Sequence, residues 1–444
     1  MDAGPAGVPS DVVDVEPPPE EPVGEVLPSQ LTPGPRAVFD TEPLEAGHIA
    51  TLWTWREGED YCADCVGIPE QCEERCIRDH LMLTVVDERG APQREFLVTM
   101  VVPNGASVGL NDGALALQEG RFVIAWQMCA GQSRCEASLR VFDRGGVPAT
   151  PRVPLYDSRM ARIGLAVHEA SGRIGVLSSR VLRRGREAST GVGFTVLTPG
   201  GEVTSPWTMV SSASAGIAAI DTNAAGFWLA FSDPDGAHPD PTCAFCEALP
   251  CDRPTCTDRS TESQDLIVVG IDVDGREFNR FEALREPDGQ AVPIWDGVDL
   301  SAADEHVLVG GVVGWGAQTE GLVDPNDMGL WNPGLSLVEV RLNTGQSVSL
   351  QQERGVAFGL SFDRRASVPS WVLHDSVVAP GGLDEDVIAF VDGELVSTTS
   401  LTNAFTAPGT VSFIDGDGGR LAVGYARDLV GDDGFFFYRA PLRR

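Results

Sequence analysis

The stretch Leu139-Arg-Val-Phe-Asp-Arg-Gly145 decides the fold, because variants of it recur along the whole chain. It is a run of β-favouring residues that ends in a turn-forming side chain and is followed by glycine. Similar stretches end at Gly90, Gly200, Gly275, Gly345 and Gly393, so that the six glycines lie 55, 55, 75, 70 and 48 residues apart. Self-similarity at such a period indicates a repeat architecture.

A second element in each repeat is an apolar strand that carries an aromatic residue. Clear copies are Phe122-Val-Ile-Ala-Trp126, Phe227-Trp-Leu-Ala-Phe231 and Leu421-Ala-Val-Gly-Tyr425, and another is Thr51-Leu-Trp-Thr-Trp55. A short strand and a turn precede most copies, and Asp-Gly or Gly-rich pairs are hairpin signals. Each repeat therefore predicts four short strands.

Four-stranded units repeated around an axis predict an all-β chain folded as a β-propeller. Seven copies of the aromatic strand predict seven blades, and six blades with a divergent cap are the alternative. The chain begins with one half of a unit and ends with the other half. We therefore expect the ring to close by pairing of N- and C-terminal strands, with Phe435–Tyr438 beside Thr51–Trp55.

Residues 1–35 differ in composition from the rest of the chain. They contain nine prolines and seven acidic residues, and the first positive charge is Arg36. Proline removes backbone donors and like charges repel, so we expect a disordered, extended tether. Residues 36–444 are then one propeller domain.

The charges exclude several function classes. The net charge is −33, and all 32 basic residues are arginine. Without lysine the chain has no P-loop, no Schiff-base lysine and no protein-kinase site. The acidic excess argues against nucleic-acid binding. No apolar run reaches the ~18 residues of a transmembrane helix.

The ten cysteines fall into three tight groups, which are typical of an oxidising, extracytoplasmic compartment. The sequence favours local disulfides within each group, with no choice among pairings in the four-cysteine groups. The members are Cys62, Cys65, Cys72 and Cys76, then Cys129 and Cys135, then Cys243, Cys246, Cys251 and Cys256. No signal peptide is visible, and we expect that an export signal has been removed or replaced.

Zinc is the rival interpretation of the cysteine groups. A short helix from Pro69 would place Cys72, Cys76 and His80 on one face, and thiolates suit tetrahedral zinc. The six-residue gap between Cys65 and Cys72 is shorter than the ~12–20 residues usual between zinc-binding pairs.

The insertions share one place in the repeat, between the aromatic strand and the strand that follows it. Cysteine-rich insertions occupy 56–80 and 232–264, and the other loops are at about 128–137, 179–191, 313–335, 376–386 and 427–433. Equivalent hairpin loops of a propeller emerge on one face, and insertions on one face of a repeat array often mark its binding side.

Candidate binding residues lie in these loops. Arg180, Arg183, Arg184 and Arg186 form a basic island that suits an anionic glycan or an acidic partner, and Trp315 and Trp331 are aromatic candidates. Asp324, Asn326 and Asp327 bring hard oxygens together and are candidate calcium ligands, although the segment lacks the distal Glu of an EF-hand. No residue set predicts a catalytic site.

The aromatic strand, the variable loop and the Leu-x-Val-Phe-Asp-x-x-Gly strand together resemble bacterial exported or surface β-propeller repeat proteins. The acidic, proline-rich start is similar to tethers that follow a lipid-bearing cysteine, which implies a lipid anchor upstream. We expect a monomeric, non-catalytic binding or scaffold protein that recognises a protein or glycan at a cell surface. The alternatives are a propeller hydrolase or lyase acting on polysaccharide, and a structural surface component.

Overall fold

The structure is a computed structural model of the 444-residue chain. The residues that it describes are 25–28, 37–45, 48–57, 78–87, 91–101, 108–130, 134–158, 163–184, 187–211, 218–234, 264–284, 293–316, 331–354, 357–362, 370–379, 382–391, 394–401, 420–427 and 434–441.

Most of the described residues lie in strands, and six sheets contain four antiparallel strands in chain order. The first three sheets are β2 (Ala37–Pro43), β3 (Ile49–Glu57), β4 (Arg78–Val86) and β5 (Pro92–Val101); β6 (Val108–Gln118), β7 (Arg121–Ala130), β8 (Arg134–Phe142) and β9 (Val153–Ser158); and β10 (Ile163–His168), β11 (Arg173–Arg184), β12 (Glu187–Leu197) and β13 (Val203–Ser211). The next three are β14 (Ala218–Asn223), β15 (Gly226–Pro234), β16 (Gln264–Ile271) and β17 (Glu277–Leu284); β18 (Pro293–Ala302), β19 (His306–Gly316), β20 (Trp331–Arg341) and β21 (Gln346–Arg354); and β22 (Ala357–Phe362), β23 (Ser370–Ala379), β24 (Gly382–Val391) and β25 (Glu394–Leu401). The prediction of an all-β chain built from four-stranded units is confirmed.

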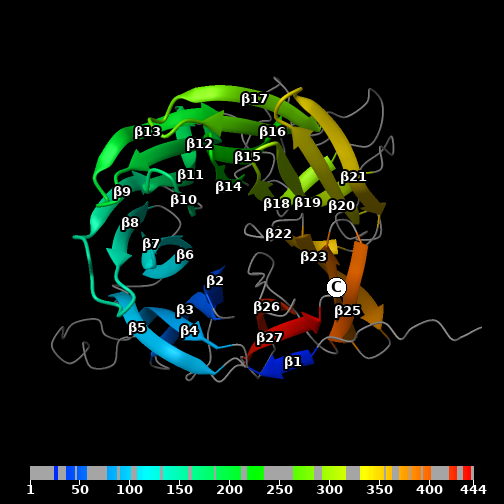
Figure 1. Ribbon diagram of the computed structural model, residues 1–444, viewed down its shortest axis with the longest axis horizontal. Coiled ribbons are helices and arrows are strands. Elements are labelled where there is room, and N and C mark those ends of the chain that lie inside the picture. Colours follow the sequence, from blue (N-terminus) through cyan, green and yellow to red (C-terminus); the bar gives the residue numbers. More distant parts are fainter. Residues whose placement is uncertain are drawn as a thin grey trace, which may run out of the picture.

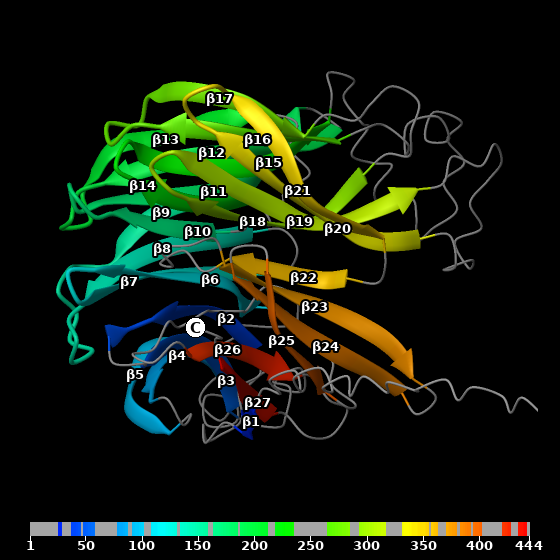
Figure 2. The ribbon, with the colours of Figure 1, turned by 45° about the vertical axis from the view of Figure 1, so that its right-hand side comes forward.

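The sheets follow one another around a central axis (Figure 1). The first strand of each four-stranded sheet lies nearest the axis and the fourth lies at the periphery. Neighbouring first strands are in contact, from β2 to β6 and onward to β10, β14, β18 and β22. Figure 2, an oblique view, shows neighbouring sheets stacked face against face.

The last sheet pairs a strand from the N-terminal region with two strands from the C-terminal region. It contains β26 (Arg420–Arg427), β27 (Gly434–Pro441) and β1 (Glu25–Pro28), in the order β1-β27-β26. The predicted pairing of Phe435–Tyr438 with Thr51–Trp55 is wrong, because β3 already has β2 and β4 on its two sides. Instead β27 pairs with Glu25–Pro28, so the predicted tether is not disordered over these four residues.

The turn after the third strand has the same geometry in the sheets of β8 and β16. The backbone N–H of Asp143 donates to Val147 O at 2.9 Å, and Asp143 Oδ1 accepts from the N–H groups of Gly145 and Val147, both at 2.8 Å. Asp272 makes the same bonds in the sheet of β16. Gly146 has φ +80°, a conformation that suits glycine.

The turn glycines also hold neighbouring sheets close together. A Cβ on Gly146 would collide with Phe96 of the preceding sheet, and one on Gly345 would lie 3.1 Å from Phe281. In each case the left-handed glycine of one sheet faces the fourth strand of the sheet before it. The close approach is made by Gly345, which is the repeat glycine of its stretch, and by Gly146, which follows the repeat glycine Gly145.

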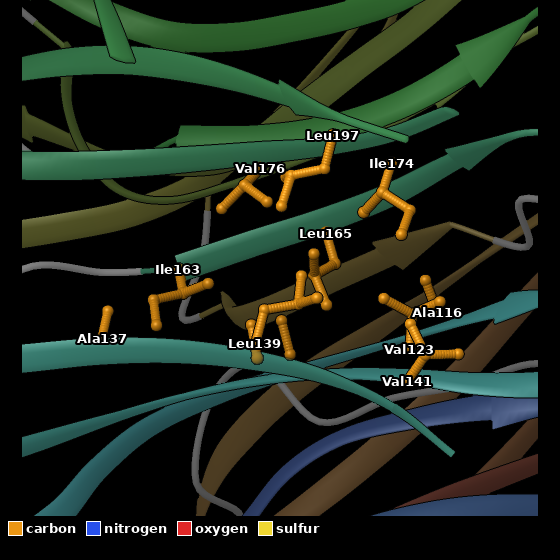
Figure 3. Packing of buried hydrophobic residues seen from close by; sticks show 12 residues of the cluster. Ala116, Val123, Ala137, Leu139, Val141, Ile163, Leu165, Ile174, Val176 and Leu197 are labelled. Carbon is orange, nitrogen blue, oxygen red and sulfur yellow. The ribbon is translucent and has the colours of Figure 1, made fainter. Parts of the chain in front are cut away.

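The hydrophobic core is divided among the interfaces between sheets. Figure 3 shows one such interface, where Val123 and Leu139 of β7 and β8 meet Leu165 and Val176 of β10 and β11. These four side chains are at most 3% exposed. Separate clusters fill three further interfaces, so the sheets β6–β9, β10–β13 and β14–β17 have apolar side chains on both faces.

Candidate functional site

Six of the predicted loops fall where the second strand of a sheet leads into the third, and the loop at 427–433 falls between β26 and β27. Strands occupy most of the loops predicted at 128–137, 179–191 and 376–386. The longest separate β15 from β16 and β3 from β4, and a third separates β19 from β20. We call the end of a sheet where its second strand leads into its third the connection end.

Hydrogen bonds between first strands show that neighbouring sheets run in the same direction. From β14 to β18, Asp221 Oδ2 accepts from Ala302 N at 2.8 Å and Asn223 Nδ2 donates to Ala303 O at 2.7 Å. Residue numbers therefore rise in the same direction along β14 and along β18.

The same order links β6 with β10 and β10 with β14. In the first case the bonds join Ile163 N to Asp112 Oδ2 and Gln118 Nε2 to Gly172 O. In the second case Thr222 Oγ1 donates to Val167 O, and His168 Nε2 lies 3.4 Å from Ala224 O. The connection ends of the four sheets from β6 to β21 therefore lie on one side, as the sequence predicts.

The connection end of the sheet β2–β5 carries a cluster of aromatic and charged side chains. The rings of Trp55 in β3 and His80 in β4 are stacked, with centroids 4.2 Å apart and an interplanar angle of 9°. The two residues are directly opposite each other in the β3–β4 ladder. His80 Nε2 lies 3.2 Å from Glu57 Oε2, so a carboxylate flanks the stack.

The cluster is open to solvent at its outer margin. The Glu57 side chain is 50% exposed and that of Arg78 is 40% exposed, and Arg78 Nη1 lies 3.8 Å from Glu57 Oε2. His80 is only 12% exposed, because the indole of Trp55 covers it. A flat aromatic group therefore stands beside an accessible carboxylate and an accessible guanidinium.

A partly buried ion pair supports the cluster from the opposite face of the hairpin. Arg56 Nε and Nη2 donate to the two carboxylate oxygens of Asp79 at 2.6 and 2.9 Å. The Asp79 side chain is only 4% exposed. A bidentate pair of this kind fixes both side chains, and since Arg56 and Asp79 alternate with the cluster residues along the strands, it also fixes the register.

The sequence analysis missed this cluster as a unit, although its signal is present. Residues 55 to 57 and 78 to 80 place an aromatic pair and two pairs of opposite charge directly across the strands, a pattern that stabilises antiparallel sheets. The helix predicted from Pro69 is wrong at His80, because Arg78–Val86 is strand β4. Residues 58–77, with Cys62, Cys65, Cys72 and Cys76, lie outside the described residues.

The basic island lies on a strand rather than in a loop. The predicted loop 179–191 is wrong, because β11 continues to Arg184 and β12 begins at Glu187. Arg180 and Arg183 pair in register with Gly191 and Ala188. The reason is that β-favouring residues such as Val181, Leu182 and Thr190 continue the ladder. Arg186 lies outside the described residues.

The register of the β19–β20 pairing places Trp315 and Trp331 close together along the ladder. Trp315 pairs with Asn332 and Gly316 pairs with Trp331, so the two tryptophans lie one step apart at the connection end of β19 and β20. The Arg180–Arg184 strand belongs to another sheet, and the sheet β14–β17 lies between the two. The structure therefore does not join the two predicted groups into one site.

The remaining site predictions are mostly outside the described residues. These are the calcium candidates Asp324, Asn326 and Asp327 and the third cysteine group, Cys243, Cys246, Cys251 and Cys256. Cys135 is buried in β8 and disulfide-bonded, and its backbone lies directly opposite Cys129 of β7. The Cys129–Cys135 pairing stays a prediction.

The described residues show neither a metal-binding cluster nor a membrane-spanning helix. They contain no group of three or more His, Cys, Asp or Glu side chains that could hold a metal ion. Nor does any helix among them have the length and apolar character of a membrane span.

No family model and no curated protein matches the chain. Solved structures that are similar include the GH93 α-L-arabinofuranosidase of Fusarium graminearum with arabinobiose (10% identity, 74% of this chain, 92% of that chain, TM-score 0.41). The hemagglutinin-neuraminidase of parainfluenza virus 5 with DANA is another (9%, 75%, 90%, TM-score 0.41). A protein of unknown function from Dyadobacter fermentans is a third (10%, 76%, 95%, TM-score 0.41). At these identities and TM-scores the similarities assign neither a family nor an activity.

Proposed function

We propose that this chain is an extracytoplasmic, monomeric, seven-bladed β-propeller that recognises a polysaccharide at its connection ends. The six four-stranded sheets are six blades, and β26, β27 and β1 are three strands of the seventh. The domain begins at β1 rather than at residue 36, and the acidic, proline-rich residues before β1 remain the proposed tether.

The observation that carries the proposal is the stack of Trp55 on His80 beside Glu57 and Arg78. A sugar ring has one flat face of C–H groups and a rim of hydroxyls. The face packs on an aromatic ring, and the hydroxyls bond to a carboxylate and a guanidinium. The neighbouring Arg56–Asp79 pair holds this arrangement before any ligand arrives, which lowers the entropic cost of binding.

Polysaccharide hydrolysis is the second candidate, and the half-exposed Glu57 beside His80 favours it. A carboxylate bonded to an imidazole is the kind of pair that moves a proton. Glycoside hydrolysis also needs a second carboxylate, about 5–10 Å away. Asp79 does not fill that role, because both its oxygens are bound to Arg56.

The test measures binding and cleavage of the same panel of polysaccharides. Arabinan, sialylated glycans and other plant and bacterial polysaccharides are titrated against the chain, and indole fluorescence and reducing ends are followed. We expect saturable binding that falls at least tenfold in Trp55→Ala and is unchanged in Leu350→Ala, a variant of an exposed apolar residue on β21.

The outcomes separate the two candidates. Binding without new reducing ends supports recognition alone. Cleavage that is lost in Glu57→Gln while binding persists supports the hydrolase. Equal binding by the parent chain and Trp55→Ala overturns the proposed site.

A further inference from the structure

We propose that the Trp55–His80 cluster is one end of a wider apolar surface that binds the methyl group of an acetyl substituent, so that the ligand of this chain is an acetylated polysaccharide. This inference deepens the proposed function and rests on it. Its basis is the register of β3, β4 and β5, which continues the aromatic stack across the sheet in apolar side chains.

Two rows of side chains cross the face of the sheet β2–β5 that carries the cluster. Residues directly opposite each other in a ladder point to the same face of a sheet, and so do residues two apart on one strand. The rows are Trp55–His80–Met100 and Trp53–Met82–Leu97, each in directly opposite positions of the β3–β4 and β4–β5 ladders. The six side chains therefore belong to one surface.

The β5 end of both rows is accessible to solvent. Met100 is 43% exposed and Leu97 is 48% exposed, whereas Trp53 at the other end of its row is fully buried. The opposite face of the same sheet packs on the sheet β6–β9 through residues such as Leu52 and Leu83. The exposed pair is therefore not part of that interface.

The neighbouring sheet gives a physical reason for this exposure. The sheet of β26, β27 and β1 lies next to β2–β5 in the ring, where β26 contacts β2 (Figure 1). Its outermost strand β1 has four residues, whereas the outermost strands of the other six sheets have six to ten. Four residues of strand span about 13 Å and the ten residues of β5 span about 33 Å. Strand β1 is therefore too short to cover the length of β5.

The repeat itself does not require apolar side chains at these positions. Asp87 and Asp143 make the same backbone bond in their turns, which aligns the sheet β2–β5 with the sheet β6–β9. The corresponding rows of the second sheet are Met128–Glu136–Asp157 and Trp126–Ser138–Pro154. There Arg152 donates to Ser138 Oγ at 2.8 Å and to Glu136 Oε1 at 3.1 Å. The same area is thus polar in one sheet and apolar in the other.

The chemistry of the exposed side chains selects the kind of ligand. The C–H face of a sugar packs on a flat ring, but Leu97 and Met100 offer flexible aliphatic groups, which fit a methyl group. A hydroxyl placed there would lose its hydrogen bonds to water. Arg78 lies two residues from His80 on the same face, and its 40% exposed side chain can donate to a carbonyl oxygen. An acetyl group contains both a methyl group and a carbonyl oxygen.

The test compares ligands that differ only in acetylation. Chitohexaose carries an acetamido group where cellohexaose has the 2-hydroxyl, and O-acetylated glucomannan is compared with the same polymer after alkaline deacetylation. Calorimetric titration of the full chain measures all four affinities. We expect the acetylated member of at least one pair to bind at least threefold more tightly. A preference in the first pair identifies an N-acetyl group as the source of the methyl, and a preference in the second pair identifies an O-acetyl group.

The variants assign the preference to the apolar rows. Leu97→Gln combined with Met100→Gln should abolish the preference and change the affinity for the unacetylated member less than twofold. Met209→Gln, which alters an exposed methionine on β13, should keep the preference. The single variant Met100→Gln, with a reduced preference expected, replaces the double variant if that variant does not fold.

The outcomes distinguish this inference from the proposed function. Equal affinities within both pairs, or a preference that survives the variants of the rows, overturn the inference alone. The inference also fails alone if the chain binds none of the four ligands but binds another polysaccharide. If the chain binds no polysaccharide, or if Trp55→Ala binds as tightly as the parent chain, the proposed function fails.

Discussion

Asp40 Oδ2 accepts a 2.7 Å hydrogen bond from the backbone N–H of Leu115, which lies 75 residues later in the chain and in the next sheet. Asp40 Oδ1 accepts from Thr41 N at 2.8 Å. Corresponding bonds join Asp112 to Ile163, Asp221 to Ala302 and Asp299 to Phe362. Carboxylates on four first strands thus tie successive sheets together near the axis.

Removal of one such carboxylate should destabilise the fold. Asp40→Ala leaves a backbone donor without its partner at the buried residue Leu115, at a cost of about 2–3 kcal/mol in the free energy of unfolding. Asp40→Asn keeps one acceptor oxygen and should lose less. Urea unfolding followed by tryptophan fluorescence measures both, with the exposed Asp274→Ala as control. A loss in Asp40→Ala no larger than in the control contradicts the stabilising role.

Adjacent glycines in one turn should respond differently to alanine. Gly201 has φ +84°, whereas Gly200 lies outside the left-handed region and its Cβ position would meet only Thr198 Oγ1, at an ordinary contact distance of 3.7 Å. A left-handed conformation costs a side-chain-bearing residue about 1–2 kcal/mol. We therefore expect thermal unfolding of Gly201→Ala at a lower temperature, with little change in Gly200→Ala. Equal shifts would remove the conformational argument.

The two side chains of the Arg56–Asp79 ion pair should show a strong coupling in their effects on stability. Arg56→Ala leaves the Asp79 carboxylate buried without its guanidinium, and such losses cost about 3 kcal/mol. The double variant Arg56→Ala with Asp79→Ala should lose less than the sum of the two single losses, by about 1–3 kcal/mol. A double-mutant cycle in urea measures this coupling. Strict additivity means that the two side chains do not stabilise the hairpin together.

Reduction should affect the β7–β8 hairpin. Peptide mapping without reductant is expected to recover Cys135 linked to Cys129, its opposite residue in the ladder. For a loop of this length the loss of the cross-link costs about 2 kcal/mol in the chain-entropy model. The Cys129→Ser and Cys135→Ser variants should each lose stability by that order under oxidising conditions. A map that links Cys135 to a different cysteine contradicts the pairing.

Local chemistry made much of the fold predictable. The Asp143 turn and its relatives were visible because an acid and a glycine at fixed spacing satisfy one set of backbone donors. The position of the insertions followed from the same repeats. What failed depended on distant partners: nothing local in Glu25–Pro28 shows that β27 needs a neighbour, and the Asp40–Leu115 bond exists only when two sheets are already packed.

The sequence predicted which face of the fold carries the candidate site, but it did not predict which residues form the site. The sequence placed the longest insertions between the correct strands, but it grouped His80 with Cys72 and Cys76, singled out Arg180 and Trp315, and did not pair Trp55 with His80. The latter pair becomes visible only when the hairpin register is known, because 23 residues separate Glu57 from its partner His80.

The pairing of β1 with β27 also sets an order of events during synthesis. Each four-stranded sheet uses consecutive residues and can form as soon as the ribosome has released them. Strand β1 is made first but has to wait for the last residues before it finds its place. A ribosome that stalls or stops early therefore releases a chain whose first strand has no partner, and quality control has an unpaired segment to recognise.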